Sequence, residues 1–133
     1  MLSDTARQRL QSDANLWLAT VRPDGRPHLV PIWFVFHAER LYICTMPDSV
    51  KSRNLRQNPN VTVALENGNS PVIAEGTAAL LPPPWPAEVS AGFQAKYDWD
   101  LNQDTDYRAL FEITPRKWLT LSLIHISEPT RPY

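Results

Sequence analysis

A cluster of residues that could bind an anion lies between Thr45 and Pro59, in the segment TMPDSVKSRNLRQNP. Ser49 is a good helix N-cap, because its hydroxyl can accept a hydrogen bond from a backbone N–H group left free in the first helical turn. A helix N-terminus also carries a partial positive charge, and Lys51 and Arg53 stand within about its first turn. The pattern predicts a local phosphate-type site, although a capped helix with solvated cations would show the same residues.

The composition limits what this site can belong to. The chain has 133 residues, which suits one domain with its own core, and a formal net charge of −1 gives no general attraction to nucleic acid or a membrane surface. Its single cysteine, Cys44, excludes an internal disulfide and fits a reducing compartment. The polar first residues resemble no signal peptide, and no apolar run approaches a membrane span. We expect a cytoplasmic protein with no nucleic-acid or membrane partner.

Alternating apolar residues and turn signals predict a mostly β protein with short helices. Six strands are expected over residues 15–21, 27–37, 41–45, 60–66, 72–81 and 107–120. Short helices are expected over residues 3–13, after Ser49, and from residue 87 to about 97. Pro31 cannot donate to a strand ladder, so it should occupy an edge, a bulge or a place where another group approaches, and Gly76 is a candidate β-bulge. This spacing predicts an antiparallel barrel or sandwich rather than βαβ units.

The order of these elements resembles a known family. The T-x-x-x-S-x-K-x-x-x-L-x-x-N-P helix segment and the E-G-x-A strand are similar to the pyridoxamine 5′-phosphate oxidase-like flavin-binding split barrels, over about residues 16–120. The segments RPDGRPHLVPIWF, KSRNLRQNP and IAEGTA are similar to a branch that uses FMN or the deazaflavin coenzyme F-420. The resemblance implies a six-stranded antiparallel split β-barrel in a domain of residues 1–120. It also implies a homodimer with the cofactor at its seam.

The same resemblance places nine residues at the cofactor. They are Val30, Pro31, Ile32, Trp33, Thr45, Ser49, Lys51, Arg53 and Asn54. The first four would lie along the isoalloxazine ring, which needs a strand edge with free polar groups and apolar cover. Ser49 and Lys51 would hold the phosphate, and Arg53 and Asn54 would supply further contacts there.

Four positions depart from the pattern of pyridoxamine phosphate oxidases themselves. Leu29, Phe34 and Val50 stand where those enzymes have basic residues, and Pro71 replaces a glutamine that contacts the ring. These losses argue against pyridoxamine phosphate oxidation as the reaction. No carboxylate pair or nucleophile triad is visible, so no catalytic side chain is predicted and the cofactor would carry hydride transfer to or from a small organic substrate. FMN is favoured slightly over the deazaflavin.

Two alternatives of another class stay open. One is a flavin-binding or sequestering module without turnover, and the other is a haem or tetrapyrrole binder with His28 or His37 as the axial candidate. These histidines have no cysteine or carboxylate at ligand spacing, so no metal site is predicted. Cys44 is expected to be a buried thiol, and the aspartates between residues 98 and 106 a solvated connector.

The last thirteen residues, LSLIHISEPTRPY at positions 121–133, form a separate segment. They resemble the translation of a transposase-adapter sequence at the end of an assembled contig. We therefore predict that this tail is not native and assign it no function.

Overall fold

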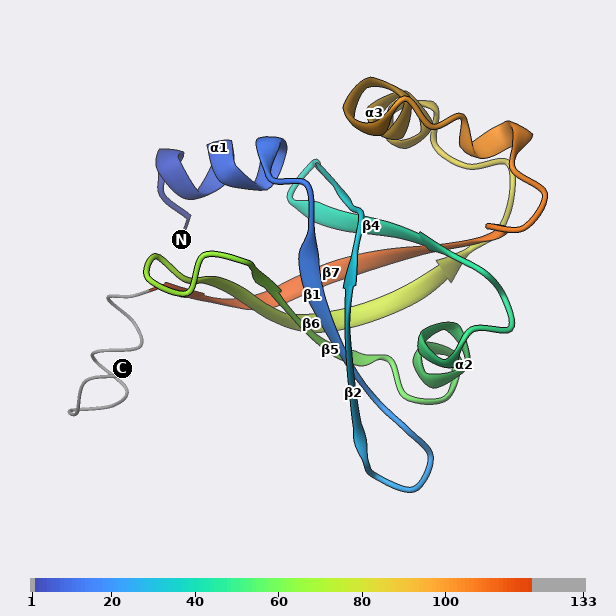
Figure 1. Ribbon diagram of the computed structural model, residues 1–133, viewed down its shortest axis with the longest axis horizontal. Helices are drawn as coiled ribbons and strands as arrows, with labels where there is room; N and C mark the ends of the chain where they lie inside the picture. Colours follow the sequence, from blue (N-terminus) through green and yellow to red (C-terminus); the bar gives the residue numbers. More distant parts are fainter. Residues whose placement is uncertain (1, 121–133) are drawn as a thin grey trace.

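An antiparallel sheet curls through residues 2–120, the part of the chain described by the computed structural model (Figure 1). Its strand order is β2-β1-β5-β6-β7-β4-β3. The strands are β1 Leu16–Val21, β2 Pro27–Ile32, β3 Val35–His37, β4 Arg40–Thr45, β5 Asn60–Leu65, β6 Val72–Leu81 and β7 Ala109–Thr120. The helices are α1 Asp4–Ser12, α2 Val50–Gln57, α3 Ala87–Tyr97 and the 3-10 turn η1 Leu101–Gln103. The expected mostly β split barrel is confirmed.

The predicted count of six strands is wrong, because the segment 27–37 is two strands in a sheet of seven. β2 pairs with β1 at one edge, whereas β3 pairs with β4 at the other edge. Between them, the Phe34 N–H donates to the Tyr97 hydroxyl at 3.0 Å, and the Phe34 carbonyl accepts from Lys96 Nζ at 3.0 Å. Side chains of α3 therefore replace the ladder bonds that the chain gives up where it changes partner. This break between the two sheet edges is the split of the barrel.

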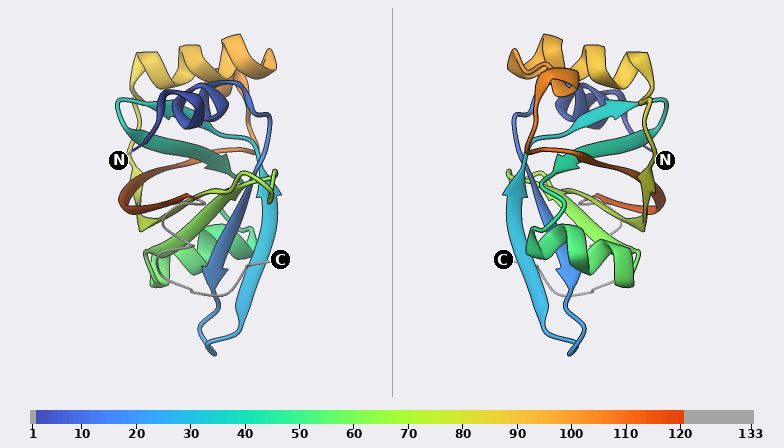
Figure 2. Two further views of the ribbon diagram at one scale, coloured as in Figure 1. Left: turned by 90° about the vertical axis from the view of Figure 1, so that its left-hand side faces the viewer. Right: turned by 90° about the vertical axis from the view of Figure 1, so that its right-hand side faces the viewer.

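Two apolar clusters hold the sheet in its curled shape. The larger fills the barrel interior and includes Leu16, Leu18 and Phe111, while the smaller joins β4 and β7 to α3 through Phe93 and Leu110. Burial of each such side chain contributes about 1.5–3 kcal/mol, which fits the apolar residues on both faces of β4 and of the first part of β7. Figure 2 shows α1 and α3 at one end of the curled sheet and α2 toward the other.

Helix α2 begins as the sequence predicted. Ser49 is its N-cap, and the Ser49 hydroxyl accepts a hydrogen bond from the Ser52 N–H at 3.2 Å. The Asn54 side chain donates to Thr20 Oγ1 of β1 at 3.0 Å, and both residues are buried. This buried bond fixes the rotation of α2 on the barrel.

The strand irregularities also follow from their residues. β2 is an edge strand, which is one of the positions expected from Pro31, and the register of β6 and β7 shifts between Glu75 and Gly76. A Cβ at Gly76 would lie 2.2 Å from the Thr114 carbonyl oxygen, so only glycine fits this bulge.

None of the helices within residues 2–120 is long and apolar enough to span a membrane. The tail 121–133 lies outside the described residues, so its non-native origin stays a prediction.

Candidate functional site

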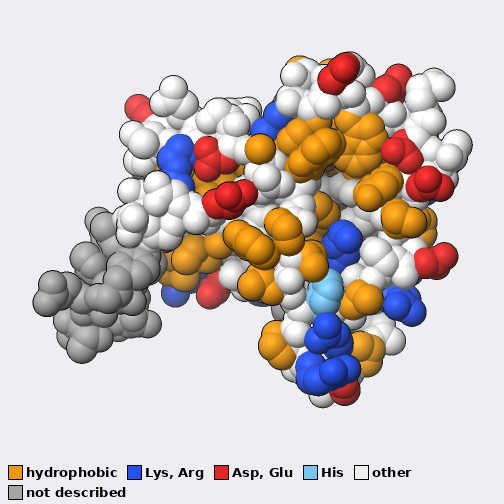
Figure 3. Space-filling view, in the orientation of Figure 1, with side chains coloured by type: hydrophobic (Ala, Val, Ile, Leu, Met, Phe, Trp, Pro, Cys, Tyr) orange, Lys and Arg blue, Asp and Glu red, His pale blue; other side chains and the backbone are white. Residues whose placement is uncertain are grey.

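A pocket of about 570 Å³ opens beside the break between β2 and β3, and we call it the aromatic pocket. Its volume lies in the usual range for small-molecule sites. Figure 3 shows apolar side chains gathered beneath α3 on this side of the molecule, with basic side chains and a histidine below them. The pocket is lined by Asn15, Pro31, Ile32, Trp33, Cys44, Lys51, Tyr97, Asp98, Trp99, Asp104 and Tyr107.

Four rings form one side of this pocket, and we call Trp33, Tyr97, Trp99 and Tyr107 the aromatic wall. Trp33 stacks on Tyr97 with ring centroids 4.4 Å apart. Trp99 meets Trp33 edge-on at 5.8 Å and Tyr107 edge-on at 5.3 Å. The rings come from the β2–β3 connection, the end of α3 and the segment before β7. Residues distant in sequence thus converge on one surface.

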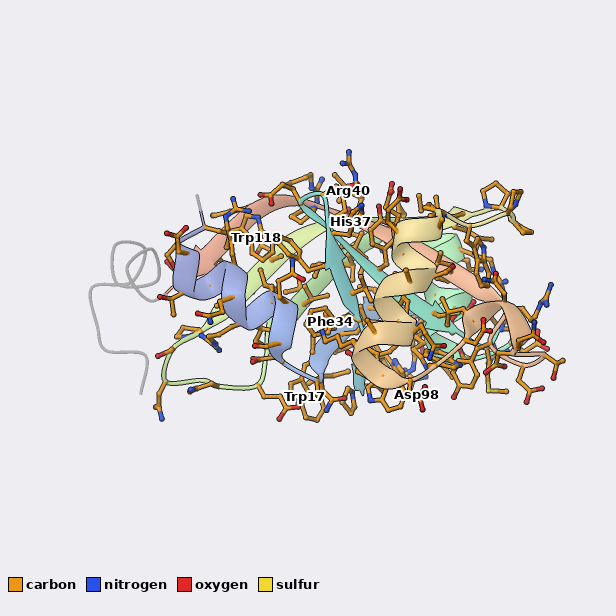
Figure 4. The ribbon with its side chains drawn as sticks, turned by 90° about the horizontal axis from the view of Figure 1, so that it is seen from above. Trp17, Phe34, His37, Arg40, Asp98 and Trp118 are labelled. Carbon is orange, nitrogen blue, oxygen red and sulfur yellow. The ribbon has the colours of Figure 1, made fainter. Side chains whose placement is uncertain are left out.

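Tyr97 connects this wall to the break in the barrel. Its hydroxyl oxygen lies 2.7 Å from the Ala14 carbonyl and 2.9 Å from the Phe34 carbonyl, in addition to accepting from the Phe34 N–H. Burial raises the pKa of Tyr97 to about 12, so the hydroxyl keeps its proton. In Figure 4, Phe34 lies beside the end of α3. The Tyr97 side chain therefore holds the chain at the end of strand β2 and also lines the pocket.

Asp104 holds the wall in place. Its carboxylate accepts the Tyr107 N–H at 2.9 Å, the Asp106 N–H at 2.8 Å and the Trp99 indole N–H at 3.0 Å. These bonds lower the pKa of Asp104, with the Tyr107 N–H contributing most. The carboxylate is therefore ionised at neutral pH and faces the pocket beside the exposed Asp98.

Lys51 enters the pocket from the first turn of α2. It is half-buried, and desolvation lowers the pKa of its ammonium group. No carboxylate within residues 2–120 pairs with it. The N–H groups of Val50 and Lys51 precede the first possible intrahelical bonds, and the Ser49 hydroxyl keeps its own hydrogen for donation. The cap and Lys51 together have the chemistry of an anion site.

A second cavity of about 620 Å³ lies on the other side of this helical turn, and we call it the basic cavity. It is lined by Arg22, Pro23, Val50, Arg53, Asn54, Arg56 and Gln57, without a carboxylate. Arg22 donates to the Pro27 carbonyl at 2.8 Å, and Arg56 donates to the Pro47 carbonyl at 2.7 Å. These bonds position two guanidinium groups at the cavity while leaving other N–H groups free.

The nine predicted cofactor residues are divided between these places. Four line the aromatic pocket, namely Pro31, Ile32, Trp33 and Lys51. Arg53 and Asn54 line the basic cavity, and Ser49 caps the helix between the two. Val30 and Thr45 line neither cavity. Their roles toward a cofactor stay predictions.

Two of the nine have polar groups with intramolecular partners. Thr45 is fully buried, and its hydroxyl donates to the Ala109 carbonyl at 3.4 Å. Asn54 is only 3% exposed and bonds to Thr20. Both contacts hold elements together, which accounts for these residues without any ligand.

Tyr97, Trp99 and Tyr107 of the aromatic wall and both pocket carboxylates were not predicted as site residues from the sequence. Asp98 and Asp104 were expected to be solvated connector residues. The high density of aromatic and acidic residues between positions 97 and 107 was the available signal. Their distance in sequence from Trp33 concealed the shared surface.

The other residues considered from the sequence are Cys44 and the histidines. Cys44 is a buried thiol, as expected, and burial raises its pKa to about 12 while Sγ donates to the Tyr107 carbonyl at 3.3 Å. Residues 2–120 contain no group of three potential metal ligands. His28 Nδ1 is buried without a hydrogen-bond partner, and desolvation lowers the pKa of this histidine.

Comparison with known proteins assigns the chain to a family. The family model described as pyridoxamine 5′-phosphate oxidase matches residues 2–122. The chain therefore belongs to this family, whose fold agrees with the curled sheet and its break.

Solved structures share the fold. A protein named F420 reductase is 24% identical, with 89% of this chain and 98% of that chain covered and a TM-score of 0.73. The heme storage protein HutZ from Vibrio cholerae is 21% identical, with 90% and 95% covered and a TM-score of 0.74. A putative pyridoxamine 5′-phosphate oxidase from Listeria innocua is 21% identical, with 89% and 96% covered and a TM-score of 0.71. At these identities the likeness establishes the fold alone.

Proposed function

We propose that this protein is an oxidoreductase that uses FMN, or alternatively the deazaflavin coenzyme F-420, to transfer hydride to or from a small organic substrate. The observation that carries the proposal is the position of Lys51. No carboxylate among the described residues pairs with it at the capped start of α2, and it lines the same pocket as residues 31–33 at the end of the edge strand. Family membership and the fold shared with an F420 reductase support this proposal.

The residues of this site match the two ends of such a cofactor. Its phosphate needs N–H donors and a cation, which Ser49, the first N–H groups of α2 and Lys51 can supply. Its ring needs apolar cover and a polar edge. In the part of the chain that the structure describes, β2 pairs only with β1, so one row of its backbone groups is free of ladder bonds beside Ile32 and Trp33.

The chain itself would bind, orient and shield the reactants. A bound flavin or deazaflavin supplies the hydride chemistry, which explains why the site needs no acid–base pair. Lys51 would fix the anionic end, and the edge of β2 would set the plane of the ring. The aromatic wall would exclude water from the opposite side of the pocket.

We also propose that the protein acts as a homodimer. Trp17, Leu29 and Pro31 share the outer face of β1 and β2, as the pairing of Trp17 with Pro31 and of Ala19 with Leu29 shows. Trp17 and Leu29 are exposed, and a second copy of the chain could cover them. Sedimentation at micromolar concentration should give a dimer, and a monomer there would contradict this proposal.

Titration with FMN tests the cofactor assignment. Lys51→Ala should weaken FMN binding by roughly 1.5–3 kcal/mol, as for loss of a charge-assisted hydrogen bond, and should barely change the free energy of unfolding. Lys117→Ala is the matched control, because Lys117 is exposed on β7 and lines neither cavity. Equal FMN affinity in both variants, or no flavin binding at all, would overturn the assignment.

A haem-binding function is the second candidate, and His28 is the observation that favours it. Its neutral ring has a buried nitrogen without a partner, and the heme storage protein HutZ shares the fold. Titration with haem should then give a Soret band that His28→Ala abolishes and His37→Ala leaves unchanged. A third experiment separates an oxidoreductase from a sequestering module without turnover. The flavin-bound protein is mixed with NADPH or reduced deazaflavin and a quinone acceptor. Reduction of the quinone indicates an oxidoreductase, and flavin binding without turnover indicates a sequestering module.

A further inference from the structure

Three of the four rings of the aromatic wall, Tyr97, Trp99 and Tyr107, are not among the residues assigned to the cofactor, and the wall has an open face. Trp33 keeps 44% of its surface exposed although Tyr97 stacks on it with an interplanar angle of 7°. Tyr107 is 37% exposed at the other side of the wall. Large exposed aromatic groups that line one pocket indicate a surface that stacks on a planar ligand.

The charges around this wall favour a cation. Two carboxylates, Asp98 and Asp104, line the pocket, whereas Lys51 is its single cationic lining residue within residues 2–120. Aromatic faces carry negative electrostatic potential and attract organic cations, and carboxylates beside them add to the attraction. The Lys96 ammonium lies 5.3 Å from the Tyr97 ring but bonds to the Phe34 carbonyl and does not line the pocket.

The wall is also rigid enough to select a ligand. Asp104 fixes the Trp99 indole by a hydrogen bond, and Tyr97 is fixed by its bonds to the backbone at Phe34. Edge-to-face contacts of Trp99 with Trp33 and Tyr107 join the remaining rings. Ring surfaces held before binding lose little conformational freedom when a ligand stacks on them.

We propose that the aromatic wall binds a planar, positively charged organic ring, and that this ring is the substrate rather than the phosphate-bearing cofactor. The anionic end of the site at Lys51 and the acidic aromatic end would then accept two different molecules side by side. The identification of the ring as substrate rests on the proposed function, whereas its binding does not require the cofactor.

The test uses N-methylquinolinium as a cationic probe, methylquinoline in mildly alkaline buffer as its uncharged counterpart, and naphthoate as an anion. Calorimetric titration should show the cation binding about five-fold or more tightly than the uncharged ring, the size expected for a cation–π contact with nearby carboxylates. Naphthoate should bind most weakly. Equal affinity for the cation and the uncharged ring, or no binding of either, would overturn the proposal.

Two pairs of variants locate the binding. Asp104→Asn should reduce the preference for the cation several-fold, whereas Asp106→Asn, an exposed residue of the same loop that lines neither cavity, should not. Trp33→Leu should weaken the binding of both rings, whereas Trp118→Leu on β7, which lines neither cavity, should weaken neither (Figure 4). Loss of binding in Trp118→Leu but not in Trp33→Leu would place the cation elsewhere and refute the proposal.

A competition experiment separates this inference from the cofactor assignment. If saturating FMN leaves the affinity for N-methylquinolinium unchanged or increases it, the wall is a second site beside the cofactor. If FMN displaces the cation competitively, the flavin ring itself binds at the aromatic wall and the substrate inference fails. Failure of FMN to bind would remove the cofactor assignment alone, because the probe titration is made without FMN as well.

Discussion

The aromatic pocket and the basic cavity are similar in size and adjoin the same turn of α2, but their walls have opposite character. The aromatic pocket has four rings and two carboxylates, and the basic cavity has three arginines and no carboxylate. Val50 lines the basic cavity, and the next residue, Lys51, lines the aromatic pocket. Consecutive helical residues point about 100° apart, so one short helix contributes to both.

This contrast shows how a nearly neutral chain can hold strongly charged local sites. The net charge of −1 gives no warning of either cavity, because the arginines and the aspartates gather at different places. An anionic group would be attracted to the α2 side and a cationic ring to the α3 side. Four changes test this division, beginning with the largest expected effect.

Asn54→Ala tests whether the polar amide of the basic cavity is structural. The change removes the donor to Thr20 Oγ1 and leaves that buried hydroxyl unsatisfied, so the free energy of unfolding should fall by about 1–3 kcal/mol. Urea denaturation measures this, with the exposed Asn102→Ala as control. An unchanged stability together with weaker FMN binding would instead assign Asn54 to the ligand.

Tyr97→Phe tests the corresponding anchor of the aromatic pocket. Loss of the hydroxyl leaves the Phe34 N–H without its partner, and the free energy of unfolding should fall by about 1–2 kcal/mol. Tyr107→Phe on the same wall should change the free energy of unfolding little, because no partner of the Tyr107 hydroxyl is found among residues 2–120. Equal losses of stability in the two variants would show that the break in the barrel does not depend on Tyr97.

Val50→Arg would add a cation between the cavities at a position that is basic in pyridoxamine phosphate oxidases. FMN binding should improve by about 1 kcal/mol, at the lower end for a charge-assisted bond because Val50 is exposed. Met46→Arg, also exposed but lining neither cavity, is the control. Improvement by both variants alike would indicate general charge attraction rather than a phosphate contact.

Lys96 predicts a pH effect confined to the α3 side. Burial lowers the pKa of Lys96 to about 8, so the unfolded chain binds this proton more tightly than the folded chain does. The contribution of Lys96 to the free energy of unfolding should therefore increase as pH rises above about 8. The measurement is made below pH 10.0, the ordinary pKa of tyrosine, so that tyrosine ionisation does not add to the effect. Thermal melts of Lys96→Met should lack this increase, whereas melts of Lys117→Met should retain it.

Local signals were sufficient for most elements. The Ser49 cap, the edge position implied by Pro31 and the bulge at Gly76 each follow from the chemistry of one residue and its neighbours. The segment 27–37 was misread as one strand because its apolar pattern continues through Trp33 and Phe34. A change of strand partner leaves no mark on that pattern when both parts face apolar surroundings.

By itself, the sequence determined the family, the mostly β class and the candidate anion site at the start of α2, because caps, turns and alternation depend on residues near each other in the chain. Only the tertiary structure decided that Tyr97 bonds to the backbone at Phe34 and that Trp33 shares a wall with Trp99 and Tyr107. It also decided that Val50 and Lys51 line different cavities. The physical reason is that these contacts depend on how the curled sheet and α3 pack, and packing brings together residues whose separation in sequence carries no local signal.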